Sequence, residues 1–107
     1  MPGYVKLIFL NDDEKVLMHT HGSGLDLPSV RLRGGNPAVV AQKYAKKLGI
    51  RLLDLNVIGH FPDAWYISSQ LRNGDAPKDY DWRVAEDITD IDTSSRVKTA
   101  IKRSKKD

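Results

Sequence analysis

The sequence predicts an α/β sandwich, in which a mixed central sheet carries a helix at 37–48 on one side and a helix at 94–103 on the other. Two observations lead to this fold class. Short aliphatic and aromatic segments recur along the chain in the pattern of strands, and one longer segment between them has the spacing and the ends of a helix. The chain has 107 residues and is 40% hydrophobic, which suits one core. We therefore expect a single domain over 1–103 and a basic C-terminal tail over 104–107.

A β-hairpin is predicted at the start of the chain. The apolar, aromatic-rich segment 4–10 is typical of a strand, the polar run 11–14 of a turn, and 15–20 of the return strand. The glycines of 22–24 predict a loop. Alternating residues then predict a short strand, in which Val30 and Leu32 face inward and Arg31 and Arg33 lie on the exposed face.

The best-defined helix of the sequence spans 37–48. Asn36 is a good N-cap acceptor, and Pro37 suits the first helical position. Gly49 is the expected C-terminal stop, because glycine adopts the left-handed conformation that ends many helices. Apolar residues at helical spacing predict the buried stripe, formed by Val40, Tyr44 and Leu48 and flanked by Ala41 and Ala45.

The second half of the chain predicts three strands and a final helix. The strands are expected over 51–61, 64–71 and 80–85. Ser94 or Ser95 is the expected cap of the last helix. The residues of that helix that face inward are expected to be Val97, Ala100 and Ile101.

Charge is unevenly distributed along a chain whose net charge is only +3. No Asp or Glu lies between Asp26 and Asp54, whereas this stretch contains the basic residues Arg31, Arg33, Lys43, Lys46, Lys47 and Arg51. Such a block marks either a surface for anionic partners or a solvated helix face.

Composition excludes several other classes of protein. The chain has no cysteine, which rules out disulfides and thiolate zinc sites. It has no apolar run of about 18 residues that would cross a bilayer. We therefore expect a soluble, cytoplasmic protein with no membrane partner.

The order and spacing of these segments resemble a Nudix (MutT-like) domain. Residues 15–18 match the family's strand ahead of the substrate loop, and Leu25–Pro28 resembles its Trp-x-Leu-Pro segment. Gly34-Gly35-Asn36, followed by a helix that ends in Leu48-Gly49-Ile50, is similar to the Nudix box. The resemblance implies a Nudix-like α/β/α sandwich. It also implies hydrolysis of nucleoside diphosphate linkages with a divalent metal.

The resemblance departs from the family at the box, which is degenerate in this sequence. Anchored on Gly49, the family's Arg-Glu-aliphatic-x-Glu-Glu pattern places Lys43, Lys46 and Lys47 where glutamates are expected. Magnesium needs carboxylate oxygens, which ammonium groups cannot replace. At about 4 Å and an effective dielectric near 20, unit charges interact by about 4 kcal/mol, and a dication roughly doubles that repulsion. We therefore expect no metal and no cofactor at this position.

The first functional hypothesis is a catalytically inactive Nudix-fold protein that binds an anionic ligand or partner. The partner would be a nucleotide, a nucleic-acid backbone or an acidic protein surface. A solvated helix face is the alternative for the lysines, but such a face usually mixes both signs of charge. The candidate ligand-binding residues are Arg31, Arg33, Lys43, Lys46, Lys47, His19, His21, His60 and Trp65.

The histidines and aromatic residues each admit two interpretations. His19, His21 and His60 have no fourth ligand and no cysteine beside them, so we expect cleft-lining or ordinary strand residues in preference to a zinc site. Trp65 and Tyr66 are adjacent on a strand and point to opposite faces. One of them is therefore expected in the core and the other at the surface, where an aromatic ring can stack on a base.

Two further hypotheses come from other classes. A Nudix-type nucleoside-diphosphate hydrolase would need a non-standard metal site, with Glu86, Asp87 or the 12–14 turn as its acids and Mg²⁺ or Mn²⁺ as its cofactor. A structural or regulatory module would instead use the fold as a scaffold for protein interactions, including a possible homodimer.

Overall fold

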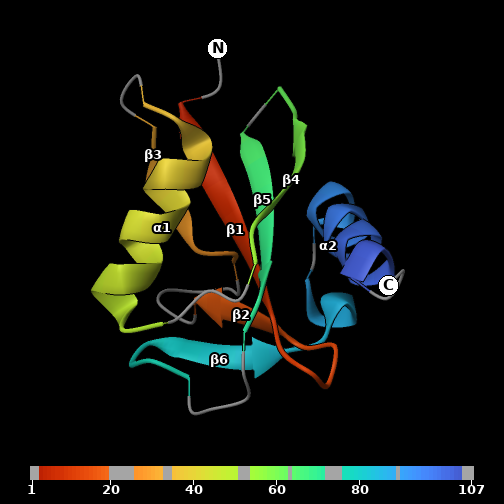
Figure 1. Ribbon diagram of the computed structural model, residues 1–107. Coiled ribbons are helices and arrows are strands. Elements are labelled where there is room, and N and C mark those ends of the chain that lie inside the picture. Colours follow the sequence, from red (N-terminus) through yellow and green to blue (C-terminus); the bar gives the residue numbers. More distant parts are fainter. Residues whose placement is uncertain are drawn as a thin grey trace.

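The computed structural model describes residues 3–19, 26–32, 35–50, 54–62, 64–71, 76–88 and 90–104 (Figure 1). The strands in these ranges are β1 Tyr4–Leu10, β2 Val16–His19, β3 Ser29–Arg31, β4 Asn56–His60, β5 Trp65–Gln70 and β6 Tyr80–Arg83. The helices are α1 Pro37–Leu48, the short 3-10 helix η1 Ala85–Asp87, and α2 Ile91–Ser104.

The strands form one mixed sheet in the order β4-β5-β1-β2-β6, with β3 paired to β1 off this path. β1 and β5 run parallel, and the other pairs are antiparallel. β3 pairs with the beginning of β1, whereas β2 meets its end at Leu10↔Val16 and continues alongside β6. The mixed central sheet expected from the sequence is thus confirmed.

The two α-helices cover opposite faces of the sheet (Figure 1). Because side chains alternate along a strand, β1 contributes to both layers. Leu7 and Phe9 pack with α1, in a cluster that contains Ala41 and Ala45. Ile8 and Leu10 instead pack with α2, in a cluster that contains Val97 and Ala100. The chain is therefore an α/β/α sandwich with a core on each side of one shared sheet.

The ends of α1 lie where the sequence placed them. The Asn36 Oδ1 accepts a hydrogen bond from the Ala38 N–H at 2.8 Å, and Pro37 occupies the first turn. Gly49 has a φ of 75°, and its N–H bonds to carbonyls of the last turn. The buried stripe differs from expectation in one respect. Ala41 and Ala45 are its buried residues, and the larger Val40, Tyr44 and Leu48 are half-buried at its margins.

The start of α2 corrects the sequence-based expectation. The helix begins at Ile91, ahead of the serines that were expected to cap it. Asp90 supplies the capping contacts, because its carboxylate accepts from the Asp92 N–H at 3.2 Å and the Thr93 hydroxyl at 2.9 Å. Ser94 is buried within the helix and donates to the Ala85 carbonyl at 3.0 Å. The predicted inward-facing residues are confirmed, since Val97 and Ala100 are buried and Ile101 packs against them.

The remaining boundaries agree with expectation within a few residues. β4 begins at Asn56, later than predicted, and residues 51–53 lie outside the described part of the chain. The predicted loop at 22–24, the polar segment 72–75 and the end of the tail at 105–107 also lie outside it. No helix among the described residues is long and apolar enough to span a membrane.

Candidate functional site

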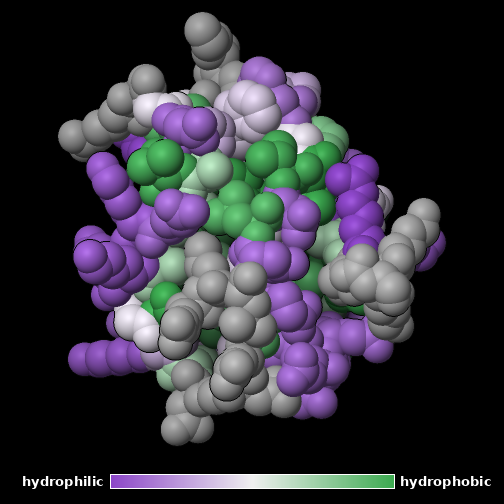
Figure 2. All heavy atoms as spheres, in the orientation of Figure 1, coloured by the Kyte–Doolittle hydropathy of each residue, from purple (hydrophilic) through white to green (hydrophobic). Residues whose placement is uncertain are grey.

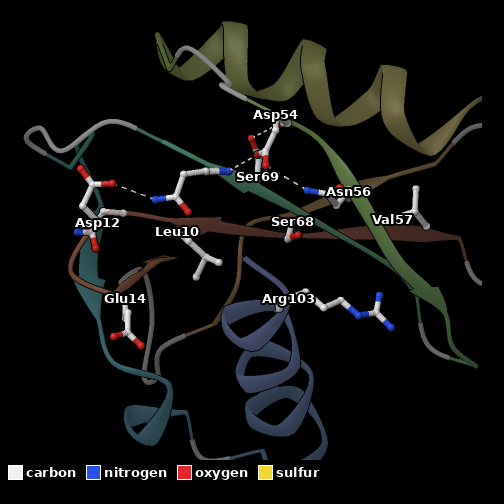
Figure 3. Close-up of a pocket in the computed structure, with 12 residues that line it drawn as sticks. Leu10, Asp12, Glu14, Asp54, Asn56, Val57, Ser68, Ser69 and Arg103 are labelled. Atoms are coloured by element: carbon white, nitrogen blue, oxygen red, sulfur yellow. Dashed lines mark hydrogen bonds between the residues drawn. The ribbon is translucent and has the colours of Figure 1, made fainter. Parts of the chain in front are cut away.

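A cavity of about 600 Å³ opens where the ends of β1 and β5 and the beginning of β4 meet α2 (Figure 3). Its acidic lining consists of Asp12 and Glu14, from the turn after β1, and Asp54, just before β4. Arg103 is the basic lining residue that the described structure provides. Hydroxyl and amide groups complete the polar lining, from Asn11, Asn56, Ser68, Ser69 and Gln70.

The cavity exists because small residues stand where the same layer elsewhere holds large ones. Ser68 lies on the α2 face of the sheet, since it pairs with Ile8 of β1 and with Asn56 of β4. Across from it, α2 contributes Ala100. Nearer the other end of β5, the same layer is filled by the buried ring of Tyr66. The small side chains of Ser68 and Ala100 leave this space unfilled.

Asp54 is held in place by several hydrogen bonds at the cavity wall (Figure 3). Its Oδ1 accepts from the Gln70 backbone N–H at 2.6 Å, and its Oδ2 accepts from the Asn56 Nδ2 at 3.2 Å. The Ser69 hydroxyl donates to the Asp54 carbonyl. The side-chain amide of Gln70 donates to Asp12 Oδ1 at 3.3 Å. A single glutamine thus contacts both carboxylates, one through its backbone and one through its side chain.

The lysines singled out in the sequence do not line this cavity. Lys43, Lys46 and Lys47 are exposed on α1, whereas Ala41 and Ala45 of the same helix are buried against the sheet. At 100° per residue, the three lysines therefore point away from the sheet. Hydrophilic side chains project along this margin of the molecule, over α1, in Figure 2. We call these three residues the lysine face.

The arginines of the predicted ligand set are not brought to the lysine face. Arg31 pairs with Tyr4 of β1, so these two side chains lie on the same face of the sheet. The next residue of β1, Val5, points to the opposite face and belongs to the α1 layer. The Arg31 guanidinium lies 6.0 Å from the Tyr4 ring centre. Arg31 and the lysine face are therefore on different sides of the sheet. Arg33 lies outside the described residues.

The histidines are also separated. His19 is on β2 and His60 on β4, with β5 and β1 between these strands. The His19 ring meets the Tyr80 ring edge-on at 5.0 Å, and the His60 ring stacks on Trp65 at 4.3 Å and 5°. His21 lies outside the described residues. Nowhere in the described ranges do three or more His, Cys, Asp or Glu residues gather as metal ligands.

Trp65 and Tyr66 divide between the faces of the sheet as predicted. Tyr66 is fully buried in the α2 layer, and Trp65 is half-buried on the α1 side. The imidazole of His60, which is exposed, covers one face of the indole. The surface aromatic is therefore Trp65, and it is already stacked within the protein.

Glu86 and Asp87 lie on η1, away from the cavity. Both are exposed, and each is close to a cation: Glu86 to Lys98 and Asp87 to Arg83, both at 3.9 Å. Arg83 also contacts Asp81, at 2.8 Å. These carboxylates belong to surface ion pairs that connect η1 to its neighbours.

Of the residues that line the cavity, the sequence pointed only to the acids of the 12–14 turn, as candidates for a non-standard metal site. Ser68 and Arg103 were assigned no role. One signal was present, because Ser68, Ser69 and Gln70 form a polar run at the end of a strand that begins with apolar residues. Both serines are buried in the structure, where polar groups normally need hydrogen-bond partners.

Comparison with known proteins rests on structure alone, since no family model and no curated protein matches the sequence. The Ap4A hydrolase of C. elegans superposes with a TM-score of 0.68 at 13% identity, over 94% of this chain and 97% of that one. The NUDIX domain of NrtR from Shewanella oneidensis, solved with ADP ribose, gives 0.61 at 13% identity, over 94% and 86%. MutT from Bacillus halodurans gives 0.59 at 11% identity, over 92% and 80%. The chain therefore has the Nudix fold, as the resemblance in the sequence implied.

Proposed function

We propose that the protein is a non-hydrolytic Nudix-fold module that binds a nucleic-acid phosphate backbone through the lysine face of α1. The observation that carries this proposal is uncompensated positive charge. In the described structure, no ion pair joins Lys43, Lys46 or Lys47 to a carboxylate. The helix itself contains no acidic residue.

The open position of these lysines favours an extended polyanion over a single nucleotide. Small ligands occupy concave sites that bury most of their surface. The lysine face is on the outer side of a helix and contributes nothing to the cavity. A phosphate backbone needs only cations spaced along an accessible surface, because its affinity comes largely from the release of counterions.

The chemistry of the available side chains supports the absence of hydrolysis. The helix that the resemblance aligns with the Nudix box offers one amide, one phenol and three ammonium groups, and none of these replaces the carboxylates that Mg²⁺ or Mn²⁺ requires. The residues do not fit a divalent metal at α1. Glu86 and Asp87 each lie beside a cation, so a metal there would compete with existing ion pairs.

Binding is tested by fluorescence anisotropy with labelled single-stranded and duplex oligonucleotides over a series of salt concentrations. We expect log K to fall linearly with log salt, with a slope of about −2 to −3 if each lysine neutralises one phosphate. The double variant Lys43→Glu/Lys46→Glu should lose most of the affinity.

The matched control is Lys15→Glu/Lys78→Glu, which changes the net charge equally at exposed lysines outside α1. Its affinity for the oligonucleotides should stay within about twofold of that of the parent, because a change in total charge alone has a weak effect. Equal losses in both variants would show a nonspecific charge effect and reject the lysine face. Turnover of a dinucleotide or nucleoside triphosphate with Mg²⁺ or Mn²⁺, abolished by Asp87→Asn, would reject the non-hydrolytic assignment.

A further inference from the structure

We infer that the nucleic acid is single-stranded, and that its bases contact the β4 edge of the sheet while its phosphates contact the lysine face. This inference rests on the proposed function and names the form of its partner. The residues that would meet the bases are Val57, His60 and Trp65, which we call the sheet-edge patch. Unpaired bases are free to contact protein, whereas the bases of a duplex are covered by their own stacking and pairing.

The sheet-edge patch lies on the same face of the sheet as α1. Trp65 packs in the α1 layer, and Val57 pairs with Ile67, which is buried in that layer. His60 pairs with Trp65 across β4 and β5. Val57 is 49% exposed and His60 is also exposed, because α1 packs over β1, β3 and β5 rather than over the edge strand β4.

The imidazole of His60 offers a flat surface to a base. It stacks on the Trp65 indole with ring centres 4.3 Å apart and planes 5° from parallel. Among the described residues, no second ring, hydrogen bond or ion pair engages this imidazole. A base on its outer face would extend the existing pair to a stack of three rings. Such stacking suits a partner of any sequence, because every base has a π face.

Exposed apolar surface connects the sheet-edge patch with α1. Figure 2 shows apolar atoms gathered between the upper part of α1 and β4, with hydrophilic side chains along the margin of α1. Val39, on α1, is 45% exposed and precedes Lys43 by one helical turn, on the same side of the helix. The apolar surface and the lysine face therefore adjoin on α1. Contiguous exposed apolar surface of this kind typically marks a binding surface.

The combination of charge, apolar surface and a flat ring selects the partner. Positive charge on α1 is not offset by any acid of that helix, so the partner is anionic. A duplex supplies the charge but keeps its base faces stacked. An acidic amphipathic peptide supplies charge and aliphatic groups but does not need the planar ring of His60. A single strand carries phosphates and flat bases together, and so matches all three features.

The test compares three labelled DNA probes with equal numbers of phosphates, by fluorescence anisotropy at one salt concentration. They are an oligothymidylate, the same strand with abasic tetrahydrofuran residues, and a duplex hairpin. We expect the full chain to bind the oligothymidylate about tenfold more tightly than either of the others, because only its bases are free to stack. Backbone contacts alone would favour the hairpin, whose charge density is higher.

Trp65 gives a second readout that reports contact at the patch itself. The chain has two tryptophans, so Trp82→Phe leaves Trp65 as the source of tryptophan fluorescence. We expect the oligothymidylate to change this fluorescence on binding, because a base joins the ring stack that contains Trp65. The abasic strand should leave the fluorescence unchanged at the same degree of saturation.

A double variant removes the patch and leaves the lysines in place. In Val57→Ser/His60→Ala, the preference for the oligothymidylate over the abasic strand should fall from about tenfold to less than about twofold. The matched control is Tyr4→Ala/Ile91→Ser, which also removes one ring and one aliphatic side chain, at positions 45% and 82% exposed outside the patch. The control should keep the full preference. Circular dichroism checks that both variants are folded.

The outcomes distinguish this inference from the proposed function. Equal binding of all three probes, lost in Lys43→Glu/Lys46→Glu, would support the proposed function and overturn the single-stranded form. No binding of any probe would reject both. An equal loss of preference in Tyr4→Ala/Ile91→Ser would overturn the role of the sheet-edge patch. A glutamate- and leucine-rich peptide that bound more tightly than the oligothymidylate, and depended on Val57 and His60, would assign the surface to a protein partner instead.

Discussion

The phenolic hydroxyls of Tyr44 and Tyr80 hydrogen-bond to each other and connect α1 to β6. Burial raises the pKa of Tyr44, and the hydrogen bond with Tyr80 raises that pKa further. Both causes favour the neutral phenol in the folded protein. The contribution of this pair to the free energy of unfolding should therefore change when the pH becomes alkaline.

The sign of this dependence follows from linkage. A group whose pKa is higher when folded than when unfolded contributes stability that is complete below the unfolded pKa, about 10 for tyrosine. This contribution is lost as pH rises through the folded pKa. We expect Tyr44→Phe to lower the free energy of unfolding by about 1 kcal/mol at neutral pH. The difference from the parent should narrow above about pH 10.

The measurement is urea unfolding of both proteins at several pH values. Tyr4→Phe is the control, because Tyr4 is 45% exposed and its hydroxyl makes no hydrogen bond among the described residues. Its effect on the free energy of unfolding should be small. A Tyr44→Phe deficit that stayed constant to high pH would show that ionisation of this phenol is not linked to folding.

At the scale of the elements, α2 contacts the sheet side of the molecule partly through the side chain of Arg96. The Arg96 guanidinium lies 4.0 Å from the Phe61 ring centre and 4.7 Å from that of Tyr66. The two rings meet edge-to-face at 5.3 Å, so the cation packs against both members of an aromatic pair. Cation–π contacts of this kind stabilise more strongly as they become desolvated, and Tyr66 is fully buried.

We expect Arg96→Ala to lower the free energy of unfolding by about 1–2 kcal/mol, through the lost cation–π contacts and the lost packing of the arginine stem. Arg96→Lys should recover only part of this, because an ammonium lacks the planar face of guanidinium. Lys98→Ala is the control on the same helix. Its exposed pair with Glu86 at 3.9 Å should contribute less than about 0.5 kcal/mol. Equal effects of the two alanine variants would contradict the role given to Arg96.

Elements with local signals were predictable from the sequence, and elements with long-range determinants were less so. The ends of α1 depend on Asn36 and Gly49, whose contacts lie within the helix's own first and last turns. The start of α2 was misplaced because Ser94 is a good cap in isolation, yet here its hydroxyl bonds to Ala85. A tertiary contact thus determined what a serine does in this helix.

At the scale of the whole molecule, the grouping of site residues could not be predicted because it depends on strand register. The alternation that exposes Arg31 was evident in the sequence. The pairing Tyr4↔Arg31, which puts it across the sheet from the lysine face, was not. The cavity combines a turn, three strands and α2, and its residues range from Leu10 to Arg103. Only the topology brings these segments together, and no local pattern marks them as one site.

The same topology predicts that the two cores unfold as one. β1 and β5 contribute alternate side chains to both layers, so neither layer can lose its packing while the other keeps its sheet. Val97→Ala removes buried volume on the α2 side and should cost about 2 kcal/mol. Trp65 and Trp82 pack on the α1 side and report unfolding there by fluorescence. We expect the variant to shift the fluorescence and circular dichroism transitions in urea by the same amount, as a two-state domain requires. A circular dichroism transition that moved while tryptophan fluorescence stayed at the parent midpoint would instead mean that α2 detaches from a sheet that remains folded.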